Sequence, residues 1–312
     1  MQPGPRPKDY IVTDEGLYFA VVLGDPEDER VIASLRYRKT PDGVRKFDTR
    51  SALDFLKSRY SRYLFSSTHL DAETTAVPLP AISRICRPEQ TVTGLLGRRP
   101  EDAVLKKART ILEYFTGNGL DAKILGITGS LMLGFQRPDS DIDFVVYDRD
   151  AFHAARKVVR KAINSGVFSD LDQDTWRETY RRRGCALSFD EYLFHEKRKD
   201  NKFLYRGTKV DISFQPKNKD SYSPRPPVTK TGIATIQAKI TDDRFIFDYP
   251  ARYGIDHDDI NEILVYTATY YGQAFRGETV EARGMIERDA GNTKYMIIGT
   301  SREAPEEYLK KR

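Results

Sequence analysis

The sequence predicts an α+β protein in which a mixed core of strands and helices is flanked by two β-rich domains. Segments rich in β-branched and aromatic residues gather toward both ends of the chain. Two segments of helical periodicity lie in the middle, and a proline-rich segment precedes the C-terminal part. We predict an N-terminal β-rich domain with a helix at 1–98, a core at 99–215, a linker at 216–232 and a small C-terminal β-barrel domain at 233–312.

The composition indicates a globular protein of a reducing compartment. The chain has 312 residues, of which 31% are charged and 11% aromatic. Its two cysteines, Cys86 and Cys185, lie far apart without CxxC spacing, which argues against a zinc knuckle or a disulfide framework. There is no apolar run long enough to cross a bilayer, and the N-terminus lacks the apolar stretch of a signal peptide. We therefore expect a cytoplasmic protein with no membrane partner.

The charge pattern favours anionic partners. Net charge is +5 and the pI is near 8.9, so the chain is mildly basic. Positive residues gather at 36–46, 177–184 and 195–202. Nucleotides or nucleic acid would fit such runs, and a solvated basic face accounts for any single run equally well.

The N-terminal part reads as a small sheet with one helix. Segments 9–24 and 30–47 are rich in β-branched and aromatic residues, and "TPDG" at 40–43 is a turn signal in which Pro presets φ and Gly accepts a positive φ. Segment 49–65 is predicted to be a helix. The proline-punctuated segment 76–90 is predicted to be a loop.

The core alternates helices and strands. Apolar residues recur at helical spacing over 101–116, with Glu101 and Asp102 at the positive end and "GNG" as the stop. The further predicted elements are a short helix after Gly129, a helix from about 150 to 165, strands at 122–128 and 141–147, and two strands within 202–215 joined by a tight turn at Arg206-Gly207-Thr208.

The C-terminal part reads as a barrel. Segment 216–232 has four prolines and little apolar content, as linkers do. Beyond it, "ATIQAKI", "RFIFDYP", "ILVYTATYY", "ETVEARGMIER" and "KYMIIGT" read as short strands separated by Gly, Asp and Asn turns. Such spacing predicts a small barrel, with an OB-like fold as the candidate.

The stretch "GSLMLGFQRPDSDIDF", Gly129 to Phe144, carries the chemistry. Asp141 and Asp143 stand two residues apart in an apolar strand, so both project to one face. Two such carboxylates repel, and desolvating them costs several kcal/mol per ion unless a cation compensates them. A pair of Mg²⁺ ions would do so, because hard cations prefer carboxylate and phosphate oxygens.

The other end of the stretch suits phosphates, and a third acid completes the site. Gly129 allows a phosphate to approach the backbone at the start of a short helix, and Ser130 adds a hydroxyl donor. Asp211 in "KVDISF" is again an acid in an apolar strand. If the two strands are neighbours, it lies beside the first two acids and completes a two-metal site. Asp139 is better explained by turn chemistry after Pro138.

The pattern resembles the polymerase-β-like nucleotidyltransferase superfamily. The spacing in "GSLMLGFQRPDSDID" is most similar to its minimal, kanamycin-nucleotidyltransferase-like branch, whose motif is GS-x10-D-x-D, and the resemblance covers about 100–215. It implies that Gly129 and Ser130 hold nucleotide phosphates, that Asp141 and Asp143 bind both metals, and that Asp211 binds the catalytic metal and helps deprotonate an acceptor hydroxyl. Many relatives have a small or basic residue after the Ser, whereas this chain continues "LMLGF".

The resemblance implies a Mg²⁺-dependent transfer of a nucleoside monophosphate from an NTP, with ATP expected, to a hydroxyl acceptor. RNA is the leading acceptor, because the chain has basic runs and a candidate barrel. A protein or small-molecule acceptor is an alternative. A nucleotide- or RNA-binding regulatory module with little or no turnover is another.

Several other residues could have a functional role, and each also has a purely structural explanation. His153 and His195 could act as bases, although solvent-facing helical histidines are the simpler account. Arginines 181–183 could meet acceptor phosphates or lie on a solvated face. Trp176 and Tyr180 are one helical turn apart, which favours core packing over base stacking. The barrel could bind single-stranded nucleic acid or serve as a docking module, because fold alone does not decide function.

Overall fold

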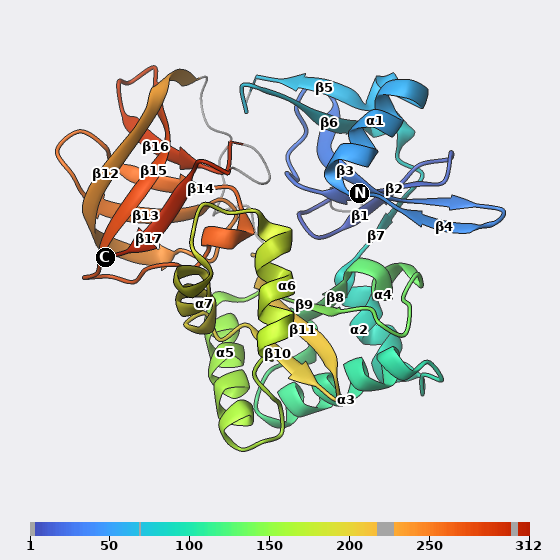
Figure 1. Cartoon of the computed structure of the whole chain (residues 1–312). Helices are drawn as coiled ribbons and strands as arrows, with labels where there is room; N and C mark the ends of the chain where they lie inside the picture. The colour runs from blue at the N-terminus through green and yellow to red at the C-terminus, as the bar shows by residue number, and fades with distance from the viewer. Residues whose placement is uncertain (1–3, 69, 217–227, 301–304) are drawn as a thin grey trace. The chain divides into compact units, whose positions relative to one another are not determined.

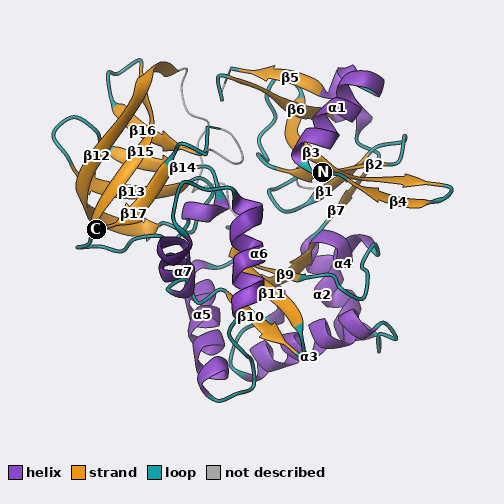
Figure 2. Ribbon diagram, in the orientation of Figure 1, coloured by secondary structure: helices purple, strands orange, loops and turns teal. Residues whose placement is uncertain are grey.

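The structure, a computed structural model, shows a mixed α+β protein and confirms the predicted fold class (Figures 1 and 2). It describes residues 4–68, 70–216, 228–300 and 305–312. The elements divide between two compact units, Met1–Tyr147 and Asp148–Arg312, and each is described by itself. The division falls inside the segment 99–215 that was expected to form one core. Among the described residues, no helix is long and apolar enough to span a membrane.

The first unit begins with a seven-stranded sheet of order β5-β6-β3-β2-β1-β7, with β4 paired to β3. Helix α1 (Thr49–Arg59) begins at a capping box made by Asp48 and Ser51 and packs Leu56 into a core with Phe19 and Tyr63. The strands are β1 (Tyr10–Val12), β2 (Leu17–Val21), β3 (Arg30–Thr40), β4 (Gly43–Lys46), β5 (Leu64–Ser67), β6 (Ala72–Pro78) and β7 (Arg84–Cys86).

Two local predictions in this sheet are wrong. The helix expected at 49–65 ends at Arg59, and its last residues form a 3₁₀ turn (Ser61–Tyr63) and the strand β5, which pairs with β6. Segment 76–90, expected to be a loop, holds the end of β6, the strand β7 and the start of helix α2 (Pro88–Gly97). Pro88 is the first helical residue, a position where the missing N–H costs nothing. Proline here marks the start of a helix.

The rest of the first unit follows the expected helix and strand pattern. Helix α3 (Ala103–Gly117) begins at Asp102, whose carboxylate accepts from two backbone N–H groups. A 3₁₀ turn (Ala122–Ile124) leads into β8 (Leu125–Thr128), helix α4 (Gly129–Leu133) follows, and β9 (Ile142–Val146) pairs antiparallel with β8. Every residue of β8 is buried.

The second unit begins with three helices and a hairpin. The helices are α5 (Arg149–Asn164), α6 (Gln173–Arg183) and α7 (Phe189–Lys197). The hairpin joins β10 (Lys202–Tyr205) to β11 (Thr208–Phe214), with Lys202 opposite Asp211. Arg206 and Gly207 have φ of 48° and 74°, as a two-residue turn between twisted strands requires. The expected strands and turn are confirmed.

The remaining strands form the C-terminal sheet, in which β12 pairs with β13, β13 with β14, β14 with β16 in parallel, β16 with β15, and β15 again with β12. Five strands therefore close a ring, which β17 extends. The strands are β12 (Val228–Phe245), β13 (Ala251–Asp256), β14 (Glu262–Val265), β15 (Thr279–Asp289), β16 (Lys294–Ile298) and β17 (Tyr308–Lys311). A relation to the OB fold stays a prediction.

Two expectations for this region change. Of the predicted linker 216–232, residues 217–227 lie outside the described residues, and 228–232 are the first residues of β12. "RFIFDYP" is no separate strand, because its first residues end β12 and the rest form the turn into β13.

Gly126 offers a test of how α2 packs on β8. A Cβ atom at this glycine would lie 2.6 Å from the Pro88 Cβ and 3.1 Å from the Pro88 carbonyl carbon. Gly126→Ala should therefore lower the free energy of unfolding by about 1–3 kcal/mol, as overpacking does. Urea unfolding of the full chain measures it.

The matched control is Gly94→Ala in α2, where a Cβ atom meets nothing within 4 Å. Alanine favours a helix over glycine by up to about 1 kcal/mol, so this variant should be neutral or stabilised. Equal unfolding midpoints for the two variants would contradict the packing described.

Candidate active site

Asp141 and Asp143 lie at the start of β9 in the first unit. Asp141 directly precedes the strand and Asp143 is its second residue. Both are half-buried, whereas Ile142 and Phe144 are fully buried. The alternation expected from the sequence is therefore present, with the carboxylates on one side of the strand and the apolar side chains on the other.

Gly129 brings backbone against one of these carboxylates. Thr128, the last residue of β8, lies opposite Asp143 in the register, and Gly129 follows with φ of 71°. A Cβ atom at Gly129 would lie 2.9 Å from Asp143 Oδ2, so a side chain here would meet the carboxylate. Ser130, half-buried, is the next residue of α4. The two ends of the motif thus lie together.

The N-terminal sheet supplies the surroundings of Asp143, which sequence reasoning missed. The rings of Tyr10 and Tyr37 lie 6.2 Å apart, and Phe135, just after α4, packs edge-on against Tyr37 at 5.5 Å. Burial raises the pKa of both tyrosines, and the nearby negative charge of Asp143 adds to the rise. The Thr128 hydroxyl donates to the Lys8 carbonyl at 2.7 Å. The sequence did offer a signal for these surroundings. Tyr10 and Tyr37 belong to a cluster separate from the aliphatic core of the sheet, and tyrosines in strands could have indicated such a second face.

Asp211 lies in β11 of the second unit, half-buried between the buried Val210 and Ile212. Its Oδ2 pairs with the Lys209 ammonium, and its Oδ1 is buried without a hydrogen-bond partner. Burial opposes ionisation, but the charges of Lys209 and nearby cations outweigh it and hold the pKa of Asp211 below its usual value. The carboxylate is ionised at neutral pH and keeps one oxygen for a further partner.

A network of charges surrounds Asp211, and we call it the Glu196 cluster. Glu196 accepts from Lys202 Nζ at 2.5 Å and from the Lys199 ammonium. Burial opposes ionisation of Glu196, yet the three nearest cations outweigh it and lower its pKa. Burial lowers the pKa of Lys199 to about 8, against the opposing effect of Glu196. The members are Arg183, Glu196, Lys199, Lys202, Lys209 and Asp211.

Positive charge is in excess in this cluster, because four cations face two carboxylates. Within the basic run 195–202, Lys199 is only 1% exposed, so the solvated-face account does not hold for it. In 181–183, Arg183 turns inward while its two neighbours are exposed. Excess buried positive charge favours an anionic partner.

Trp176 and Tyr180 pack in the core, as expected. Trp176 is 3% exposed, and its ring lies 6.4 Å from that of Tyr192. The Tyr180 hydroxyl donates to the Leu187 carbonyl at 2.7 Å.

The donor set fits Mg²⁺ at the first unit's motif. Asp141 and Asp143 offer the hard oxygen ligands that Mg²⁺ prefers, and the backbone of Gly129 stands so close that a Cβ atom there would lie 2.9 Å from Asp143 Oδ2. Among the residues that the structure describes, no group of three or more His, Cys, Asp or Glu side chains is arranged to hold a metal.

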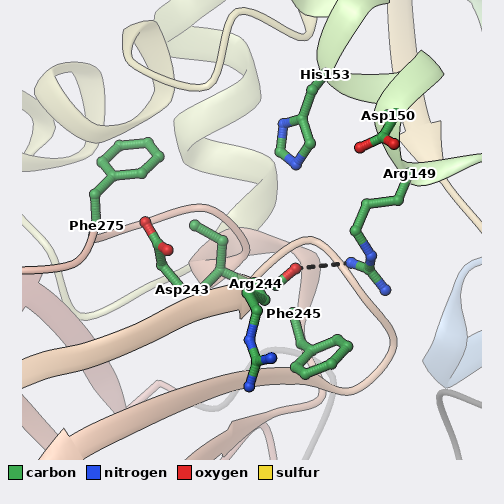
Figure 3. A pocket seen from close by; sticks show the side chains of 8 residues that line it. Arg149, Asp150, His153, Asp243, Arg244, Phe245 and Phe275 are labelled. Carbon is green, nitrogen blue, oxygen red and sulfur yellow. Dashed lines mark hydrogen bonds between the residues drawn. The ribbon is translucent and has the colours of Figure 1, made fainter.

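A cavity of about 420 Å³ in the second unit is a different place (Figure 3). Arg149 is held there by Asp248 and donates to the Arg244 carbonyl at 2.8 Å. Arginines and aspartates balance in its lining, and none of the residues of the predicted site contributes. The lining residues are Arg149, Asp150, His153, Asp243, Arg244, Phe245, Ile246 and Phe275.

The account of His195 as a solvent-facing residue is wrong, and its use as a base stays a prediction. The side chain is 2% exposed. Nδ1 donates to the Gln273 carbonyl at 3.0 Å, and Nε2 accepts from the Lys311 N–H at 3.3 Å. Only the neutral ring can make both bonds. Burial, reinforced by Lys199, lowers the pKa of His195 to about 4.

His153, half-buried, lines the cavity of Figure 3 and contacts Arg156.

The neutral His195 predicts a loss of stability in acid. The unfolded-state pKa is about 6.5, so its contribution to stability is complete above pH 6.5 and is lost as the pH falls toward 4, by about 3 kcal/mol in total. His195→Asn keeps an amide donor for Gln273 and does not titrate. Its free energy of unfolding should therefore fall less between pH 6.5 and 4.5, as measured by urea titrations.

His257→Asn is the control. His257 lies in the loop after β13, and its Nδ1 accepts from the backbone N–H groups of Asp259 and Ile260. In this variant the free energy of unfolding should change with pH as it does in the wild type. An unchanged pH slope in His195→Asn would contradict the buried neutral ring.

Comparison with known proteins gives a relative whose name states no activity. The chain is 30% identical over 335 aligned positions to the protein of Methanocaldococcus jannaschii described as "Uncharacterized protein MJ1086", and the alignment covers 98% of each. No family model and no solved structure matches the chain. At this identity and coverage, the chain belongs to the same family as the archaeal protein.

Proposed function

We propose that this protein is a Mg²⁺-dependent nucleotidyltransferase that transfers a nucleoside monophosphate from an NTP, with ATP expected, to a hydroxyl of RNA. One observation carries the proposal. The backbone at Gly129 stands against the Asp143 carboxylate with no room for a side chain between them, and Asp141 lies beside it. This is the arrangement that the Gly-Ser and Asp-x-Asp spacing predicts for a nucleotide–metal site.

Each residue has a role that its surroundings support. The half-buried carboxylates of Asp141 and Asp143 would hold the metal, and Gly129 and Ser130 would receive the phosphates at the start of α4, where Gly129 has no side chain. Mg²⁺ bound there would neutralise charge on the phosphates while the acceptor hydroxyl attacks the α-phosphate and pyrophosphate leaves.

The proposal gives Asp211 the position of the third acid. Asp211 is suited to the role because it is ionised and has an oxygen without a hydrogen-bond partner. In that position it would hold the catalytic metal and orient the acceptor hydroxyl for loss of its proton.

A second candidate, nucleotide or RNA binding without turnover, is favoured by the ion pair between Lys209 and Asp211, which engages one oxygen of the third acid. The second oxygen of Asp211 has no hydrogen-bond partner, which favours an active transferase.

The deciding experiment incubates the full chain with each α-labelled NTP, Mg²⁺, and RNA, protein or small-molecule extract. Label in RNA supports the proposal. Label in protein or in small molecules would identify that class as the acceptor in place of RNA. No label at all would support the binding module.

Asp143→Asn should lose at least two orders of magnitude of transfer, because the variant keeps the shape of the side chain but not the charge that holds metal. Its melting curve establishes that the variant is folded. Asp139→Asn, in the exposed loop before β9, is the matched control and should transfer normally. Equal transfer by all three proteins would remove Asp143 from the site.

Asp211→Asn should separate binding from chemistry. NTP affinity with Mg²⁺ should change little, while transfer falls by two orders of magnitude or more, about 3 kcal/mol in the barrier. Calorimetry with a non-hydrolysable NTP and a transfer assay test the two halves. Near-normal transfer would show that another acid completes the site. Asp200 would be tested next, and Asp139 has already been substituted as the control above. Asp200 already pairs with Arg160 at 2.5 Å.

A further inference from the structure

The basic run 36–46 lies on the hairpin of β3 and β4 in the first unit, and the proposed function gives it no role. Strand β2 pairs with β3 only as far as Arg38, so the turn end of the hairpin projects from the sheet (Figure 1). The run carries five cations, and its single acid, Asp42, stands in the exposed turn. The register of the hairpin pairs Tyr37 with Lys46, Arg38 with Arg45 and Lys39 with Val44.

A β-bulge decides which side of the sheet each cation occupies. Leu35 and Tyr37 pair with adjacent residues of β2, so Arg36 between them is an extra residue in β3. Leu35 belongs to the aliphatic core, whereas Tyr37 belongs to the cluster on the other side of the sheet. Because side chains alternate along a strand, Arg36 points away from the side of Leu35. The bulge therefore brings Arg36 and Tyr37 to the same side.

Two of the five cations are used by the aliphatic side of the sheet. Arg38 lies over the Phe55 ring, 5.4 Å from its centroid, and Arg45 lies over the Phe47 ring at 4.6 Å. Phe47 is part of the aliphatic core, and Phe55 packs against it. Cation–π contacts of this kind account for both arginines without a ligand.

The other three cations, Arg36, Lys39 and Lys46, lie on the opposite side, and we call them the basic face. Lys46 stands opposite Tyr37, and Lys39 stands opposite Val44. Tyr37 and Val44 both belong to the cluster on that side of the sheet. The two lysines are exposed and Arg36 is half-buried, so a ligand can reach them from solvent.

The basic face leads to the candidate active site. The Phe135 ring lies 5.5 Å from the ring of Tyr37, and the Phe135 N–H donates to the Ser130 carbonyl at 2.9 Å. Ser130 follows Gly129, whose backbone stands against the Asp143 carboxylate. All these residues belong to the first unit. Ring contacts and a hydrogen bond thus connect the base of the hairpin to the proposed nucleotide–metal site.

Cations at intervals along an exposed hairpin suit a chain of phosphates. Lys39 stands three residues beyond Arg36, about 10 Å along an extended strand at about 3.3 Å per residue. A nucleotide held at Gly129 would meet only the near end of this row, whereas a strand of nucleic acid would meet all of it. Protein interfaces have an apolar core and are depleted of lysine, so the basic face is poorly suited to a protein partner.

We propose that the basic face binds the phosphate backbone of single-stranded RNA near its 3′ end and directs the terminal hydroxyl toward Asp141 and Asp143. That the bound strand is the acceptor rests on the proposed function. The contact with phosphates does not, because it requires neither NTP nor turnover.

Binding of a fluorescent oligouridylate to the full chain, without NTP and over a series of salt concentrations, tests the proposal. Lys39→Gln combined with Lys46→Gln should bind about 10-fold more weakly at low salt, because two phosphate contacts are lost. The plot of log binding constant against log salt concentration should become less steep by about 1.4, since each contact with a single strand contributes about 0.7. Oligoadenylate should show the same changes, because phosphates carry no sequence information.

Arg45→Gln combined with Arg50→Gln is the matched control. It removes the same charge from the other side of the sheet, since Arg45 lies over Phe47 and Arg50 is an exposed residue of α1. This variant should keep the wild-type affinity and slope, and melting curves establish that both double variants are folded. Equal weakening by the two double variants would show that net charge alone attracts RNA and would overturn the proposal.

Two other results of this assay would also contradict the basic face. One is wild-type affinity and slope in the variant that lacks Lys39 and Lys46. The other is binding of polyglutamate as tight as that of an oligouridylate of equal charge, which would overturn the assignment to nucleic acid.

Crosslinking of the unaltered protein is an independent test. A strand with 4-thiouridine a few nucleotides from its 3′ end should crosslink within 36–46, and a strand with 4-thiouridine at the 3′ end should crosslink within 129–144. Internal crosslinks found only outside the hairpin would overturn the basic face. Terminal crosslinks found only in the hairpin would overturn the direction of the strand.

The two proposals fail in different ways. If RNA binding depends on Lys39 and Lys46 but no NTP label is transferred, the transfer function is lost and the basic face stands. If RNA is labelled and the variant lacking both lysines binds and labels it like the wild type, the basic face alone is lost. Asp143→Asn should keep wild-type RNA affinity in this assay, which separates the nucleotide site from the RNA site.

Discussion

An ionised carboxylate in a buried strand must be compensated, and much of this structure is arranged around that requirement. In the first unit, Asp143 stands in a strand whose other side chains are buried, and a Cβ atom at Gly129 would lie 2.9 Å from its Oδ2. In the second unit, Asp211 has the same strand setting and is compensated by lysine and arginine side chains. We infer that the first unit receives the nucleotide and that the second holds the third acid ready.

The Glu196 cluster extends this requirement into the fold of the second unit. A buried ion pair adds little net stability, but removing one partner is costly because the other charge is left uncompensated. Glu196 therefore fixes Lys199 and Lys202, and Lys199 in turn fixes the Thr269 carbonyl. Through these bonds the charge balance near Asp211 also sets the position of the segment that carries Tyr271.

Sequence reasoning succeeded where the signal is local and failed where it is not. The alternation around Asp143 and Asp211, and the turn at Arg206, follow from strand periodicity and turn chemistry, and the structure has them. Prolines misled it at 76–90, because Pro88 suits a helix start as well as a loop. The burial of His195 and Lys199 was missed, because the carbonyls to which they donate, those of Gln273 and Thr269, are 78 and 70 residues away. A local sequence pattern does not predict hydrogen bonds between residues so far apart in the chain.

The choice of RNA over a small acceptor follows from where the suitable groups lie. A small molecule needs an enclosed cavity with a few converging polar groups. The cavity of Figure 3 has balanced charges, and Arg149 in it is already bound by Asp248. The cations of the Glu196 cluster instead act on Asp211, and the Lys199 ammonium also donates to the Thr269 carbonyl. Cations in excess of carboxylates suit an acceptor that carries phosphates, as RNA does.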